Sequence, residues 1–110
     1  MSALGLHQER FVSMLALLYA RADFLAIRLR LGCGWCQDNH HMAHSLHKDR
    51  LAQDIDIVDE DDNLGTWEDY EPLGRYWEKI GGSWGGRFEV GADGRGNDPR
   101  HFSLAYGGRK

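Results

Sequence analysis

Histidines and carboxylates gather in two parts of this sequence. Residues 40–57, HHMAHSLHKDRLAQDIDI, hold four of the six histidines and run into alternating aspartates. Further on, DPRHF places Asp98 three residues before His101. A catalytic zinc ion usually takes three protein ligands from histidine, aspartate and glutamate, which leaves a fourth position for water. Hydrolysis also needs a carboxylate that moves the water's proton without binding the metal. The two stretches therefore contain the groups that a metal-dependent hydrolase needs.

Spacing alone leaves the choice of ligands open. His47 and Asp54 are seven residues apart, which suits a loop followed by a strand. Asp54 and Asp56 would share one face of that strand, so either carboxylate could bind a metal. The proline that follows Asp98 disfavours a helical backbone there. A local bend could therefore bring the Asp98 carboxylate towards a metal held by His101.

The only two cysteines lie in CGWC, residues 33–36, and allow three interpretations. A thioredoxin-like redox motif needs its first cysteine at the start of a helix, but the QDNHHMAH that follows is a poor helix. A zinc ribbon that uses Cys33, Cys36 and two histidines is possible on ligand type, yet it would leave the rest of the chain without a role. Two reduced thiols beside a loop are the favoured interpretation, because cytoplasmic proteins seldom form disulfides.

A small α+β domain is expected to position these groups. Apolar residues from His7 to about Ala22 follow the spacing of an amphipathic helix. Residues 24–32 and 51–58 alternate as half-buried strands. A second helix is predicted from about Tyr70 to Ile80, with Gly81 as its stop signal. The glycine-rich and aromatic remainder predicts short strands joined by a loop. On the first helix the apolar positions are Phe11, Met14, Leu15, Leu18 and Tyr19.

Length and composition fit one soluble domain over residues 1–110. A chain of 110 residues with 42% hydrophobic and 27% charged residues supports one modest core. The net charge of −4 argues against nucleic-acid binding. No stretch reaches the roughly 18–20 apolar residues of a membrane span, and no secretion signal is visible. We therefore expect a monomer that is made in the cytoplasm, binds no nucleic acid and does not insert into a membrane.

Taken together, the two stretches resemble one family of zinc peptidases. SLHKDRLAQD, residues 45–54, resembles the S-x-H-x-x-x-x-A-x-D signature of the family of zinc D-alanyl-D-alanine carboxypeptidases and dipeptidases, which includes phage L-alanyl-D-glutamate endopeptidases. WGGRF followed by DPRHF resembles the second signature of that family, a tryptophan-glycine stretch and then a carboxylate three residues before a histidine. Both signatures occur in the expected order, and the resemblance covers most of the chain.

The resemblance implies a zinc site and a fold. The zinc ligands would be His47, Asp54 and His101, which chooses Asp54 over Asp56. Asp56 would then be a structural partner on the same strand face. The three histidines at positions 40, 41 and 44 would be loop or rim residues. The implied fold is that of the DD-peptidases and hedgehog-like domains, a central antiparallel sheet with flanking helices and zinc at the sheet.

The resemblance also implies residues for catalysis and for substrate. Asp98 would be the general base and acid. Ser45 would help to hold the substrate, and Trp84 would line the cleft, although a core tryptophan is an equally good interpretation of Trp84. One position departs from the family, because Cys36 stands where an arginine is expected to stabilise the developing oxyanion.

Three functions stay open at this point. The first is a zinc-dependent peptidoglycan peptidase, an L-alanyl-D-glutamate endopeptidase of the bacteriophage endolysin type that cuts stem peptides of the cell wall after release from the cytoplasm. The second is a D-alanyl-D-alanine carboxypeptidase. The third, suggested by Cys36, is a zinc-binding or cell-wall-binding homologue that has lost catalysis.

Overall fold

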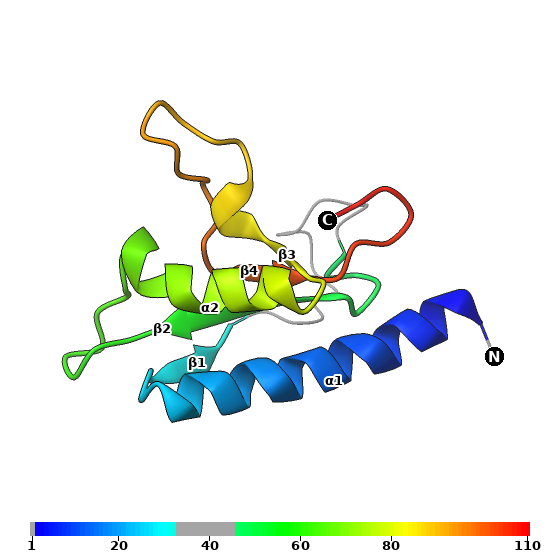
Figure 1. The fold of residues 1–110 in the computed structure, drawn as a ribbon, viewed down its shortest axis with the longest axis horizontal. Helices are drawn as coiled ribbons and strands as arrows, with labels where there is room; N and C mark the ends of the chain where they lie inside the picture. The colour runs from blue at the N-terminus through cyan, green and yellow to red at the C-terminus, as the bar shows by residue number, and fades with distance from the viewer. Residues whose placement is uncertain (1, 33–45) are drawn as a thin grey trace.

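An antiparallel sheet with two helices against one face forms the fold (Figure 1). The structure is a computed structural model that describes residues 2–32 and 46–110. The predicted α+β class with a central antiparallel sheet and flanking helices is confirmed. The elements are α1 (Ala3–Phe24), β1 (Leu29–Leu31), β2 (Ala52–Ile57), α2 (Trp67–Lys79), β3 (Ser83–Trp84), the 3-10 turn η1 (Gly85–Arg87) and β4 (His101–Ser103).

Polar side chains fix the starts of both helices. The Ser2 hydroxyl accepts a hydrogen bond from the Gly5 N–H (2.9 Å) and caps α1. The Asp69 carboxylate accepts one from the Thr66 N–H (2.8 Å) just ahead of α2. Because of these caps, α1 begins four residues before the predicted start at His7, and α2 begins three residues before the predicted start at Tyr70.

The core lies between the helices and the sheet. The rings of Phe11 and Trp77 meet edge to face with centroids 5.8 Å apart, and those of Trp77 and Phe102 do so at 5.9 Å. The buried Trp77 indole also donates a hydrogen bond to the Ser103 carbonyl (2.8 Å). These contacts tie α1, α2 and β4 together. The buried residues of α1 are Phe11, Met14, Leu18 and Ala22.

Strand register divides the side chains between the two faces of the sheet. The strands lie in the order β1-β2-β4-β3, and Asp54 of β2 is paired with His101 of β4. Phe102 of β4 is paired with Trp84 of β3. Paired residues of an antiparallel ladder point to the same face, and neighbours along a strand point to opposite faces. Phe102 and Trp84 therefore face the helices, whereas Asp54 and His101 face the opposite side.

The first strand is shorter than predicted. The prediction covered residues 24–32, but β1 spans only Leu29–Leu31. Phe24 still belongs to α1, and Ala26 turns the chain with a left-handed backbone at φ 57°. The alternating apolar residues of 24–32 therefore include the end of α1 and the following turn, and only the last part of this stretch forms the strand.

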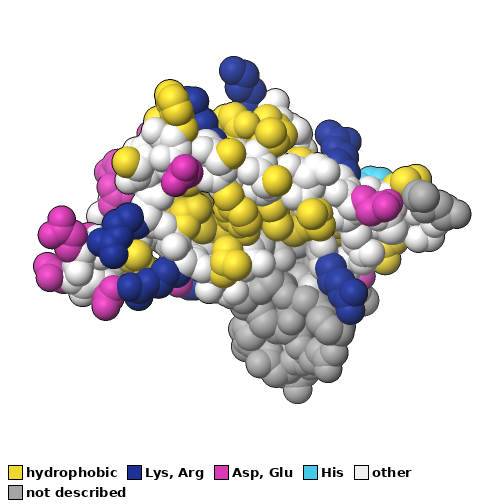
Figure 2. Space-filling view, turned by 90° about the horizontal axis from the view of Figure 1, so that it is seen from below, with side chains coloured by type: hydrophobic (Ala, Val, Ile, Leu, Met, Phe, Trp, Pro, Cys, Tyr) yellow, Lys and Arg dark blue, Asp and Glu magenta, His cyan; other side chains and the backbone are white. Residues whose placement is uncertain are grey.

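The outer side of α1 leaves apolar side chains in solvent. Figure 2 shows a band of hydrophobic atoms on the face of the molecule seen from below. No helix among the described residues is long and apolar enough to cross a membrane. The exposed apolar residues of α1 are Leu6, Val12, Leu17 and Phe24.

Candidate metal centre

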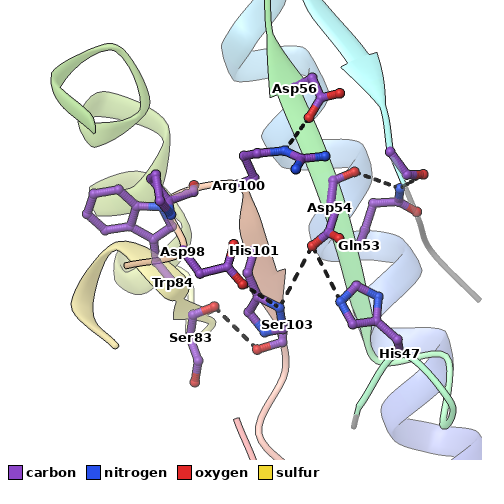
Figure 3. Close-up of polar contacts among 12 residues, drawn as sticks. His47, Gln53, Asp54, Asp56, Ser83, Trp84, Asp98, Arg100, His101 and Ser103 are labelled. Carbon is purple, nitrogen blue, oxygen red and sulfur yellow. Dashed lines mark hydrogen bonds and ion pairs between the residues drawn. The ribbon is translucent and has the colours of Figure 1, made fainter. Parts of the chain in front are cut away.

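Two histidines and one aspartate converge on the face of the sheet away from the helices. One nitrogen or oxygen atom from each of His47, Asp54 and His101 lies within 4.8 Å of the other two. His47 Nε2 lies 3.4 Å from Asp54 Oδ1, and His101 Nδ1 lies 4.0 Å from the same oxygen (Figure 3). Ligands of a tetrahedral zinc ion are about 3.3–3.5 Å apart. Small side-chain movements would therefore let this group hold a metal ion.

Two kinds of backbone structure place the group. Asp54 and His101 are direct partners in the β2–β4 ladder. His47 lies in a turn that the Leu51 N–H closes by donating to the Leu46 carbonyl (2.9 Å). The same turn is anchored to α1, because Gln8 Nε2 donates to the backbone carbonyl of residue 49 (2.9 Å). The sheet thus fixes two members of the group, and a turn anchored to α1 fixes the third.

Burial and charge suit these residues to binding a cation. The His47 and His101 residues are 2% and 7% exposed. Burial raises the pKa of Asp54, but the hydrogen bond from His47 and the charges of His47, His101 and Arg100 outweigh it and lower that pKa overall. Asp54 is therefore an ionised carboxylate at neutral pH, the form that binds a metal.

Asp98 lies beside the group without belonging to it. Its Oδ2 is 4.0 Å from His101 Nδ1, and its side chain is 49% exposed. The predicted bend is present, since the His101 N–H donates to the Asp98 carbonyl (3.1 Å). Burial, followed by the charge of Asp54, raises the pKa of Asp98. A carboxyl group with a raised pKa next to a metal-binding group is suited to taking up and releasing protons.

Gly85 allows the bend that carries Asp98 and His101. A Cβ atom on Gly85 would lie 2.0 Å from the Asp98 carbonyl oxygen and 2.8 Å from His101 Cβ. Both distances are far below van der Waals contact. The first is to a backbone oxygen, which cannot move aside as a flexible side chain could. Only glycine lets η1 approach the bend this closely.

We therefore expect Gly85→Ala to weaken metal binding by at least about tenfold, because the bend must shift away from Asp54. A zinc titration against a chromogenic chelator measures this change. Gly91→Ala is the matched control, since its new Cβ would make only ordinary contacts, the nearest at 3.5 Å. If Gly85→Ala and Gly91→Ala bind zinc with equal affinity, the bend tolerates the added methyl group and the prediction is wrong.

Trp84 supports the bend instead of lining a cleft, which corrects the prediction. The residue is 1% exposed, and its indole donates a hydrogen bond to the Pro99 carbonyl (2.8 Å). A Cβ on Gly74 of α2 would lie 2.1 Å from the Trp84 ring, so the helix packs directly on it. Pairing with Phe102 turns the side chain towards the helices. The interpretation of Trp84 as a core residue therefore holds.

Asp56 is a structural partner of Arg100, in line with the role that the family resemblance implied for it. The Asp56 side chain on β2 accepts a hydrogen bond from Nε of Arg100, which lies in the bend before β4 (2.5 Å). Arg100 itself was missed by sequence reasoning, although it lies between Asp98 and His101 in DPRHF. Several other sequence predictions concern residues outside the described part of the chain, namely Cys33, Cys36, His40, His41, His44 and Ser45.

Comparison of the chain with protein-family models and with curated proteins finds no match. Any functional conclusion therefore depends on the geometry of the candidate metal centre and on the two sequence signatures.

Proposed function

We propose that the protein is a zinc-dependent peptidase that cleaves the stem peptides of peptidoglycan. The observation that carries this proposal is the position of Asp98, a carboxylate beside the His47, Asp54 and His101 group but outside it. A metal hydrolase needs both parts, three ligands and one separate acid–base group. The two signatures that resemble the zinc D-alanyl-D-alanine carboxypeptidase family support the same assignment.

The donor set favours zinc among the common metals. Two imidazole nitrogens and one carboxylate oxygen are typical ligands of catalytic zinc, whereas calcium and magnesium prefer oxygen ligands alone. Three protein ligands leave room for water and substrate. When bound, zinc would polarise the scissile carbonyl and lower the pKa of its water to roughly 7.

Asp98 would act first as the general base and then as the general acid of the reaction. Its carboxylate would take a proton from the attacking water and pass it to the leaving amine nitrogen. Burial and the charge of Asp54 raise the pKa of Asp98, which makes its carboxylate a better proton acceptor than an ordinary aspartate. Asp54 would stay ionised throughout, because nearby positive charge lowers its pKa.

The substrate proposed first is the L-alanyl-D-glutamate bond, as in endolysins of phage. In this proposal the enzyme is a monomer that is made in the cytoplasm and reaches the cell wall after release. A homologue that binds zinc but has lost catalysis is the second candidate, because Cys36 stands where the family is expected to carry an arginine.

Digestion of purified peptidoglycan tests the proposal. The zinc-loaded protein is incubated with it, and the released peptides are identified by mass spectrometry and amino-terminal analysis. We expect new amino-terminal D-glutamate, which disappears with a chelator and returns with added zinc. Loss of a terminal D-alanine would instead indicate carboxypeptidase activity. Stoichiometric zinc without any product would support the inactive homologue and contradict the peptidase.

A further inference from the structure

Arg100 lies next to the candidate metal centre, between the strand residues Asp54 and Asp56 (Figure 3). Its Nε donates to Asp56 Oδ1 at 2.5 Å, and its side chain is 41% exposed. It is also close enough for its charge to act on both Asp54 and Asp98. A partly exposed cation therefore borders the site on the side of the bend.

Gly32 leaves space for the guanidinium. A Cβ on Gly32 would lie 3.2 Å from Arg100 Nη2 and 3.1 Å from Asp54 Cβ, so a side chain at this position would crowd both groups. The Gly32 backbone is itself fixed, because its N–H donates to the Asp54 carbonyl (2.8 Å). Arg100 is thus held by Asp56 at Nε, and the missing side chain of Gly32 leaves room for its Nη2 atom.

The outer edge of the guanidinium has capacity for another anion. A guanidinium offers five N–H donors in a planar fork that matches a carboxylate. Asp56 engages Nε, and no side chain in the described part of the chain accepts a hydrogen bond from the Nη atoms. Arg100 can therefore bind a carboxylate that is presented at the site.

Both peptides considered for this enzyme carry such a group at the same place. In the L-alanyl-D-glutamate bond of the wall, glutamate continues the chain through its γ-carboxyl group. Its free α-carboxylate therefore lies on the carbon that bears the scissile nitrogen. A terminal D-alanine has a carboxylate on the equivalent carbon. Asp98 would protonate this leaving nitrogen, and Arg100 is only two residues beyond Asp98.

We propose that Arg100 is a specificity-determining residue that binds the free α-carboxylate of the substrate residue on the leaving side of the scissile bond. This inference rests on the proposed peptidase function, since that function identifies the peptide. Charge-assisted paired hydrogen bonds are stronger than neutral ones, so the carboxylate is expected to improve binding by about tenfold or more over a carboxamide.

Two dipeptides that differ only at this group test the inference. N-acetyl-L-alanyl-D-glutamate has the free α-carboxylate, and N-acetyl-L-alanyl-D-isoglutamine has a carboxamide there. Binding is measured by calorimetry or NMR titration on the zinc-loaded Asp98→Asn protein, in which turnover is expected to be roughly 10²- to 10⁴-fold slower. Arg100→Gln is introduced into that background, and Arg75→Gln is the matched control. Arg75 lies on α2 and is paired with Glu71, so its replacement removes the same charge elsewhere.

We expect the protein with Arg100 to prefer the acid over the amide by about tenfold or more. Arg100→Gln should remove this preference while zinc content and affinity for the amide stay the same, and Arg75→Gln should keep the preference. If Arg100→Gln preserves the preference, or weakens both ligands equally, the inference is wrong and Arg100 has only its structural role with Asp56.

A second measurement does not use the Arg100→Gln variant, so it does not depend on whether that variant still binds zinc. With Arg100 intact, the acid and not the amide should shift the side-chain Nε–H resonance of Arg100. A resonance that responds to neither ligand overturns the inference. Failure of the peptidase proposal would look different. The protein would then leave peptidoglycan uncut but would still prefer the acid dipeptide, and this preference would still depend on Arg100.

Discussion

Replacement of His101 by alanine is expected to abolish stoichiometric zinc binding, and His47→Ala should do the same. Each variant leaves only one imidazole beside Asp54, so a site with three protein ligands becomes a site with two. The loss should exceed the roughly 10- to 100-fold decrease that follows removal of a residue that only supports a ligand. Elemental analysis of purified protein and competition with a chelator of known affinity measure the effect.

His7→Ala is the matched control for these two variants. His7 lies on α1, where its Nδ1 bonds to the Ala3 carbonyl (2.8 Å) and its ring contacts Tyr106 with centroids 4.9 Å apart. Zinc content of this control should equal that of the wild type. Full zinc in both His47→Ala and His101→Ala would eliminate the proposed site.

Asp98→Asn is expected to retain zinc and lose most of the peptidase activity. The amide has nearly the same shape as the carboxyl group, but it can neither accept the proton of the attacking water nor deliver one to the leaving amine. General acid–base groups contribute roughly 10²- to 10⁴-fold to rate. We therefore expect kcat on a purified stem peptide to fall within that range while the zinc content is unchanged.

Asp93→Asn provides the comparison for Asp98→Asn. Asp93 is exposed on the loop that leads to the bend, where its Oδ1 accepts a hydrogen bond from the Arg95 N–H (3.0 Å). This variant should keep wild-type activity. Near-normal turnover by Asp98→Asn would mean that another group moves the proton. Loss of zinc from it would instead identify Asp98 as a metal ligand.

Much of the fold follows from local patterns. The apolar stripe with Phe11, Met14 and Leu18 predicts α1, and these residues are buried as expected. The start of α2 at Trp67 was missed because Trp67 and its two acidic neighbours precede the apolar stripe. The cap formed ahead of the helix is a local feature, and the T-x-x-D pattern could have revealed it.

The candidate site depends on contacts that a one-dimensional pattern does not contain. Alternation places Asp54 and Asp56 on one face, and it cannot separate their roles. Pairing with the distant β4 separates them, because Asp54 lies opposite His101 and Asp56 lies within reach of Arg100. Only the family signature pointed to Asp54 beforehand. The burial of Trp84 is likewise set by its pairing with β4.

The strand order also has a consequence for how the protein is made. β4 follows the other three strands in the sequence, yet it lies between β2 and β3 in the sheet. Until the ribosome has added residues 101–103, β3 has no partner strand and the metal-binding group lacks His101. Long-range pairing of this kind is slow to form compared with local helices. Completion of the sheet and assembly of the site are therefore one late event, and an incomplete nascent chain carries neither.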